Sequence, residues 1–177
     1  MIYGVDVSRW QPTVDWATLK ANGVEFVFIK ATQGNYSVDT MLKSHVDGAN
    51  AVGMIVGLYH WCDPLVNAES QARYFIDKTR GLKFHMASAD VEQFWADWQE
   101  WSAGNITKYL SPDVISNNAR TILNTWKAEL QAPGVLYSRA SFIHGFARPM
   151  LSWVCNWPLW MAHYPYATGR IKTTWDV

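Results

Sequence analysis

The chain has 177 residues, of which 49% are hydrophobic and 17% are charged, and its formal net charge is zero at pH 7. This length supports one domain, residues 1–177, with a substantial core. A neutral chain without a basic cluster argues against nucleic acid as a partner. No apolar run approaches the ~20 residues that a membrane-spanning helix needs, so we expect no membrane insertion. A monomer is the default expectation.

Strand and helix signals alternate along most of the chain. Strands are predicted over 2–6, 26–31, 54–60, 84–92, 134–138 and 158–163. Helices are predicted over 15–22, 39–52, from Asn67 onward and from Ser111 to Leu130, while the last third shows little further helix. Repeated strand–helix units indicate a parallel sheet. No G-x-G-x-x-G or P-loop follows any strand, so an irregular TIM-like β/α barrel is favoured over a nucleotide-binding fold.

Two carboxylates, Asp90 and Glu92, are one residue apart at the end of the fourth predicted strand. Alternation along a strand points both side chains to the same face. Two acids held that close resist ionising together, so one of them should keep its proton toward neutral pH. A third acid, Asp6, ends the first predicted strand. A proton donor beside a second carboxylate is typical of a glycoside hydrolase.

Other polar residues also lie at or just beyond predicted strand ends, where β/α barrels carry their catalytic groups. The set from four strands is Asp6, His60, Asp90, Glu92 and Tyr137. A metal site is the rival use of Asp90, Glu92, His60 and His163. No H-x-x-x-H or H-E-x-x-H spacing supports it, so we expect neither a metal nor another cofactor. For His60, a hydrogen-bonded core position is the default interpretation.

Eleven tryptophans are unusual in a domain of this size. Trp95, Trp98 and Trp101 follow the carboxylate strand at a spacing that cannot turn all three inward. Flat aromatic faces can bind the apolar faces of sugar rings, although core packing is the simpler role for any one of them. Lys30 lies in an apolar strand, so we expect it to find a carboxylate and to be structural.

The two cysteines, Cys62 and Cys155, lack a metal-type C-x-x-C spacing. Whether they pair depends on the fold, and two free thiols are the simpler expectation. The N-terminus shows no basic-then-apolar signal pattern. We therefore expect the protein to be made in the cytoplasm of the host and to act on the bacterial cell wall after its release.

Several motifs together resemble glycoside hydrolase family 25, the Chalaropsis-type lysozymes. The opening, Gly4 to Gln11, reads GVDVSRWQ and resembles the family's G-(I/V)-D-V-S-x-W-Q start. Further similarities follow in order: Val14-Asp15-Trp16, FVFIKATQG over 26–34, GLYHW over 57–61, Asp90-Val91-Glu92, VLYS over 135–138 and LWMAHY over 159–164.

The resemblance implies an irregular barrel of about five β/α units plus extra strands. It implies hydrolysis of the β-1,4 bond between N-acetylmuramic acid and N-acetylglucosamine in peptidoglycan. Glu92 matches the family's acid, and Asp6 and Asp90 match its supporting carboxylates. The candidate substrate-binding residues on the matching motifs are Tyr59, Trp61, Tyr137, Trp160 and Tyr164. The expected partner is therefore the peptidoglycan glycan strand, cut by a phage-type lysin.

The chain departs from the family pattern at two points. Gln33 stands where the family often has Glu, and the chain reaches Val177 before the family's further D-x-N aspartate. We therefore expect a truncated or differently closed barrel. A neutral domain has no charge-based means of holding an anionic wall, so we also expect a wall-binding domain in the full-length protein. The alternatives are a binding module without turnover and a glycosidase acting on another polymer such as chitin.

The role of the second carboxyl is open between a retaining nucleophile, an inverting base and a group that orients the substrate's own N-acetyl group. We favour the last route, with Asp90 as the orienting group.

Overall fold

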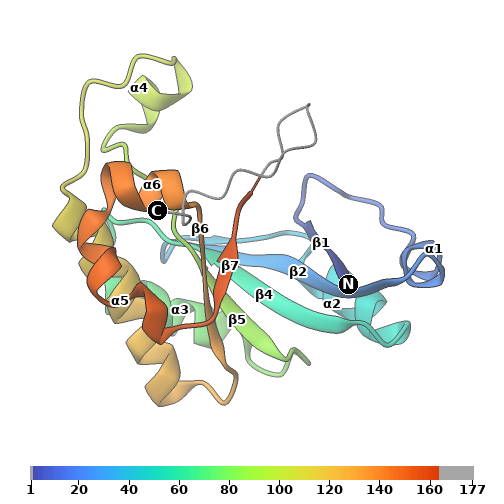
Figure 1. Ribbon diagram of the computed structural model, residues 1–177. Helices are drawn as coiled ribbons and strands as arrows, with labels where there is room; N and C mark the ends of the chain where they lie inside the picture. The colour runs from blue at the N-terminus through green and yellow to red at the C-terminus, as the bar shows by residue number, and fades with distance from the viewer. Residues whose placement is uncertain (1, 164–177) are drawn as a thin grey trace.

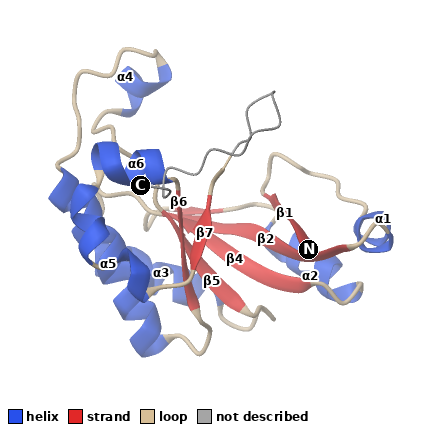
Figure 2. Cartoon of the chain, in the orientation of Figure 1, coloured by secondary structure: helices blue, strands red, loops and turns tan. Residues whose placement is uncertain are grey.

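The computed structural model describes residues 2–163 (Figure 1). Its centre is one curled sheet whose helices pack against the outer face (Figure 2). The strands are β1 (Tyr3–Val7), β2 (Val24–Gln33), β3 (Ser37–Val38), β4 (Ile55–Trp61), β5 (Met86–Asp90), β6 (Gly134–Ser138) and β7 (Leu159–Met161). The helices are α1 (Trp16–Ala21), α2 (Leu42–Ala51), α3 (Ala68–Thr79), α4 (Trp98–Ser102), α5 (Pro112–Glu129) and α6 (Ala140–Phe146), with 3-10 turns at Arg148–Ser152 and Val154–Asn156. No helix within the described residues is long and apolar enough to cross a membrane.

The sheet has the strand order β1-β2-β4-β5-β6-β7, with every neighbouring pair parallel. The short β3 pairs antiparallel with β2. Phe28 of β2 stacks on Trp160 of β7 with ring centroids 4.1 Å apart, although three strands separate β2 from β7 in the sheet. The sheet therefore curls until its two sides touch through side chains. This curled, mainly parallel sheet confirms the predicted TIM-like β/α fold.

The outer face of the sheet carries the core. Outward residues such as Ile29, Leu58 and Leu136 are fully buried under the helices. Trp126 of α5 and Phe75 of α3 fill this layer with ring centroids 4.5 Å apart. The Trp126 indole also donates to the Ala72 carbonyl, so the large ring is buried without an unpaired N–H.

Local signals account for several helix ends. Asp15 and Asn67 cap α1 and α3 by accepting from backbone N–H groups, and Gly23 ends α1 with a φ of 83°. Ser111 stands at the N-cap of α5 before Pro112, but its side chain makes no capping bond.

Two expectations about the elements were wrong. The carboxylate strand ends at Asp90, so Glu92 lies just beyond β5 rather than inside it. The last third is not poor in helix, because α6 and two 3-10 turns fill it. The N-cap residue of α6, Arg139, makes no side-chain capping bond, so the usual start signal is missing there.

Candidate active site

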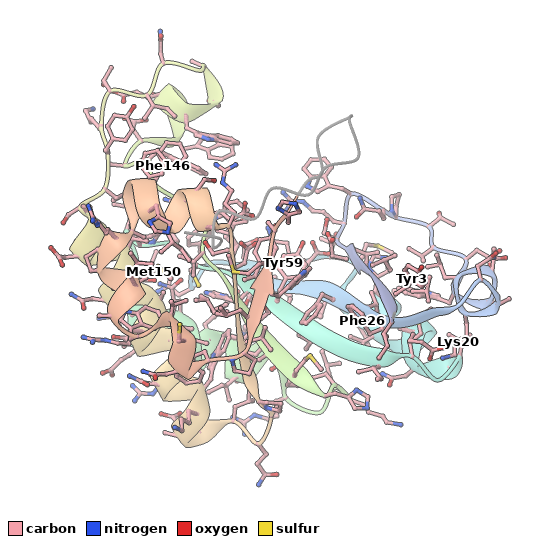
Figure 3. All side chains as sticks on the ribbon, viewed as in Figure 1. Tyr3, Lys20, Phe26, Tyr59, Phe146 and Met150 are labelled. Atoms are coloured by element: carbon pink, nitrogen blue, oxygen red, sulfur yellow. The ribbon has the colours of Figure 1, made fainter. Side chains whose placement is uncertain are left out.

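A cleft of about 300 Å³ lies on the concave side of the sheet, at the C-terminal ends of the strands. It is lined by Asp6, Ser8, Trp10, Lys30, Tyr59, Trp61, Asp90, Glu92, Tyr137 and Trp160. Strand register explains much of this set, since Asp90 is paired with both Trp61 and Tyr137, and Tyr137 is paired with Trp160. Tyr59 is labelled in Figure 3, near the middle of the sheet.

The cleft thus gathers the three predicted acids and four of the five predicted substrate-binding residues. The fifth, Tyr164, lies outside the described residues. His60 is absent from the cleft lining because it points to the outer face, where Thr32 Oγ1 and Gln71 Oε1 bond its two ring nitrogens at 2.7 and 3.0 Å. Burial lowers the pKa of His60 to about 4. The default interpretation of His60 as a hydrogen-bonded core residue is therefore confirmed.

Asp90 and Glu92 are neighbouring carboxyls that act on each other through charge and through a hydrogen bond. Asp90 is only 5% exposed, and its Oδ1 is buried without a hydrogen-bond donor among the described residues. Two ionised carboxylates cannot donate to each other, whereas a proton held by either one makes that carboxyl a donor to the other. The pair is therefore built to keep one proton.

The electrostatics of the pair point the same way. Burial raises the pKa of Asp90 well above its usual range, and the negative charge of Glu92 raises it further, while Lys30 opposes the shift. Burial also raises the pKa of Glu92, although the hydrogen bond with Asp90 and the positive charge of Arg139 pull it down. Asp90 is the more deeply buried of the two and therefore holds the shared proton more tightly at rest.

Asp6 and Tyr59 complete the polar part of the cleft. Burial raises the pKa of the Asp6 carboxyl, with a smaller opposing effect from its own backbone N–H. Burial also raises the pKa of Tyr59, and the nearby charges of Asp90 and Asp6 add to the shift. Tyr59 is therefore a neutral hydroxyl that can donate a hydrogen bond at any ordinary pH.

Lys30 differs from its prediction. Its Nζ donates to Gln33 Oε1 at 3.2 Å and lies 5.3 Å from the centroid of the Trp61 ring. Burial lowers the pKa of Lys30, and the charges of Asp90 and Asp39 oppose this from a distance. Lys30 thus lines the cleft beside a neutral amide, where the expectation was a structural lysine paired with a carboxylate. The lysine's hydrogen-bond acceptor is therefore Gln33, the residue that stands where the family often has Glu.

Three further residues near the acids were not singled out from the sequence. Ser8 and Trp10 line the cleft, and Arg139 places its charge near Glu92. Arg139 directly follows β6, so the strand-end rule could have found it, as it found Tyr137. Cys62 is buried and Cys155 is exposed, and both thiols are free. Within residues 2–163, no three His, Cys, Asp or Glu side chains gather in an arrangement suited to a metal ion.

A curled parallel sheet with a buried pair of acids at its C-terminal edge defines a β/α-barrel glycosidase type of site. The model of glycosyl hydrolases family 25 matches residues 5–177, and the chain belongs to this family. It is 28% identical to lysozyme M1 of Streptomyces globisporus over 194 residues, covering 98% of this chain and 60% of the relative.

It is also 32% identical over 171 residues to the uncharacterized protein YegX of Escherichia coli K12, covering 92% of this chain and 56% of YegX. Among solved structures, a muramidase from Acremonium alcalophilum superposes with a TM-score of 0.80 at 27% identity, covering 100% of this chain and 84% of that one. The chain spans about half to three-fifths of the length of the curated relatives that it matches along nearly its whole length.

Proposed function

We propose that this chain is a peptidoglycan hydrolase that cleaves the β-1,4 bond between N-acetylmuramic acid and N-acetylglucosamine. The observation that carries the proposal is the neighbouring pair of acids, Asp90 and Glu92, in a cleft at the strand ends. Family membership supports it, as do the names lysozyme and muramidase among the similar proteins. Enclosed acids of this kind supply the proton that departure of a sugar requires.

In the proposed reaction, Glu92 is the general acid. When substrate binds, the proton that the pair shares moves from Asp90 to Glu92, which leaves Asp90 as a carboxylate. Glu92 gives its proton to the glycosidic oxygen as the bond from that oxygen to C1 of N-acetylmuramic acid breaks, so the leaving N-acetylglucosamine departs as a neutral alcohol. The Glu92 carboxylate left behind then takes a proton from the attacking water. Asp6 holds a negative charge near the pair, which favours the protonated form of Glu92 beforehand.

Asp90 is proposed to orient the substrate's own acetamido group. A retaining nucleophile normally lies ~5 Å from the acid and an inverting base farther away, whereas Asp90 lies within hydrogen-bonding reach of Glu92. Asp90 is therefore better placed to accept the acetamido N–H while the acetamido oxygen attacks C1. The ring intermediate formed in this way is opened by water. A covalent glycosyl adduct trapped on Asp6 or Asp90 would contradict this route.

The aromatic residues of the cleft are proposed to bind sugar. Trp61 and Trp160 offer flat faces, and Tyr59 and Tyr137 add hydroxyl groups beside the acids. Tyr164 stays a prediction from the sequence alone. Peptidoglycan is proposed to be bound by this cleft without a cofactor.

The experiment compares this chain with Glu92→Gln on purified Gram-positive peptidoglycan, followed by borohydride reduction and mass spectrometry of the products. We expect muramitol ends with the unaltered chain and their loss in the variant. Reduced glucosamine ends would move the cut to the other bond and contradict the proposal. Wall binding without new ends would instead favour the binding module.

The role as a phage-type lysin, with synthesis in the host cytoplasm, is a further proposal that rests on the sequence. It is tested by expressing the chain in bacteria with and without a co-expressed membrane pore. Lysis that depends on the pore supports it, and lysis without the pore contradicts it.

A further inference from the structure

Residues 93–110 form a separate lobe beside the cleft, here called the α4 lobe, which projects beyond α6 (Figure 1). Backbone bonds close its base, where Ala96 N–H donates to Lys108 at 3.0 Å and Leu110 N–H donates to Phe94 at 2.9 Å. Inside the lobe, Glu100 accepts from the backbone of Thr107 and Lys108 and from the Thr107 hydroxyl. These hydrogen bonds hold the side chains of the small lobe in fixed positions.

One side of the α4 lobe is anchored to the domain by aromatic packing. Phe94 stacks on Phe146 of α6 at 4.2 Å, and Tyr109 lies parallel to the same ring at 6.2 Å. Phe146 is labelled in Figure 3 at the base of the lobe. Because Phe94 and Tyr109 are committed to this contact, the orientation of the lobe relative to the cleft is set.

The other side of the lobe carries three tryptophans in a continuous stack. Trp101 lies between Trp95 and Trp98, with ring centroids 4.5 and 4.7 Å away. The exposed fraction rises outward along the stack, from 5% at Trp95 through 37% at Trp101 to 61% at Trp98. Trp95 also meets Trp61, a lining residue of the cleft, at 6.4 Å. The stack therefore continues the aromatic wall of the cleft out onto the lobe.

This wall bounds a second hollow of about 740 Å³. The hollow shares Trp10, Lys30 and Trp61 with the catalytic cleft, so the two are continuous. Trp10, which is 76% exposed, adds a further aromatic surface to the lining. Several large rings exposed around one hollow are unusual for a surface without a ligand.

The floor of the hollow is polar and already hydrogen-bonded. Gln93 accepts from the Trp61 indole at 3.4 Å and donates to Asp63 at 3.3 Å, and Asp63 accepts from the Tyr36 hydroxyl at 2.9 Å. Gln93 and Asp63 are both buried. The chain of bonds fixes the Trp61 ring in the wall that the two hollows share. Flat rings beside fixed polar groups suit a saccharide, which presents apolar ring faces and hydroxyl edges.

We propose that this hollow is an extended binding site for additional sugar units of the glycan strand, with Trp98, the exposed end of the stack, packing its outer face on a sugar ring beyond those at the acids. The inference rests on the proposed function for the identity of the polymer. It assigns to the α4 lobe a role in preferring long glycan strands over short ones.

The test uses the Glu92→Gln chain, so that ligands survive, and calorimetry with peptide-free N-acetylglucosamine–N-acetylmuramic acid oligomers of four and eight sugars. We expect the longer oligomer to bind more tightly. Adding Trp98→Ala should lower the affinity for the octamer by about tenfold, which is typical of truncating an interface aromatic. It should also reduce the ratio of the octamer affinity to the tetramer affinity. Trp98→Tyr, which keeps a flat ring, retains most of that ratio.

Tyr3→Ala is the matched control, because Tyr3 is 59% exposed and lies on the side of the molecule away from the lobe (Figure 3). A length preference that Trp98→Ala leaves unchanged overturns the inference, as does equal binding of the two oligomers. An effect of Trp98→Ala seen only with peptide-bearing glycan also overturns it, in favour of a site for the stem peptide.

Failure of the proposed function looks different. In that case the unaltered chain produces no muramitol ends, while the length preference and its dependence on Trp98 persist.

Discussion

Replacing Asp90 by Asn should destroy activity and make the protein more stable at neutral pH. The side chain is 5% exposed, one of its oxygens lacks a donor among the described residues, and Glu92 places a second acid beside it. An unsatisfied buried polar group costs about 1–3 kcal/mol. Asn keeps the volume, removes the ionisable group and can donate to Glu92. We therefore expect a gain of about 1–2 kcal/mol, or roughly 2–8 °C in Tm for a chain of this size.

The sign of the pH dependence follows from the raised pKa of Asp90. Between the unfolded pKa, near 3.8, and the higher folded pKa, the folded state binds more protons than the unfolded state. Stability from this group is therefore fully present below that window and is lost as the pH rises through it. The advantage of Asp90→Asn should be largest at neutral pH and should shrink toward pH 4.

The assay is thermal unfolding followed by circular dichroism from pH 4 to pH 8, alongside the release of reducing ends from peptidoglycan. Asp47→Asn is the matched control, since Asp47 is an exposed acid of α2 that pairs with Lys43 on the surface. Its effect should stay within about 0.5 kcal/mol. A Tm of Asp90→Asn at or below that of the unaltered chain at pH 7, or a gain independent of pH, would refute the reasoning.

Three further predictions follow from the site. Activity should fall as the pH rises through the raised pKa of Glu92. Because the Arg139 charge lowers that pKa, Arg139→Gln should move the alkaline limb of the pH–activity profile to higher pH. An alkaline limb that stays in place or moves to lower pH contradicts this. Muramidase activity should persist in excess chelator, measured by release of reducing ends, and loss restored by a divalent ion would reverse that expectation. A thiol reagent should label exposed Cys155 in the folded protein and reach Cys62 only on unfolding, since Cys62 is buried and burial raises its thiol pKa; mass spectrometry of each peptide decides this.

Most of the residues that line the cleft could be predicted from the sequence because their signals are local. Alternation within short strands places Asp6, Tyr59 and Tyr137 toward one face, and parallel strands end at one edge. The meeting of Asp90 and Glu92 was predicted from a strand that runs through both residues. The strand ends at Asp90, yet the two carboxyls still meet just beyond it.

The α4 lobe could not be predicted in this way. Its position depends on the stack of Phe94 on Phe146, two residues 52 positions apart with no shared periodic pattern. The contrast between buried Trp95 and exposed Trp98 is likewise a product of that docking rather than of spacing. Lys30 was misassigned for a related reason, because its nearest polar partner, Gln33, lies beyond a register shift in β2.

The core and the cleft are formed by opposite faces of the same strands, so the packing of the core determines which residues face the cleft. In β4, Leu58 and His60 are buried outward while Tyr59 and Trp61 line the cleft. A slip of one residue would exchange the two sets, so the packing of the outer layer holds the cleft residues in register. Gly57 serves the inner face, since a Cβ there would lie 2.4 Å from the Phe28 ring that stacks on Trp160. A methyl group at Gly57, two residues before Tyr59, would therefore displace the Phe28 ring and disturb the stack through which β2 meets β7.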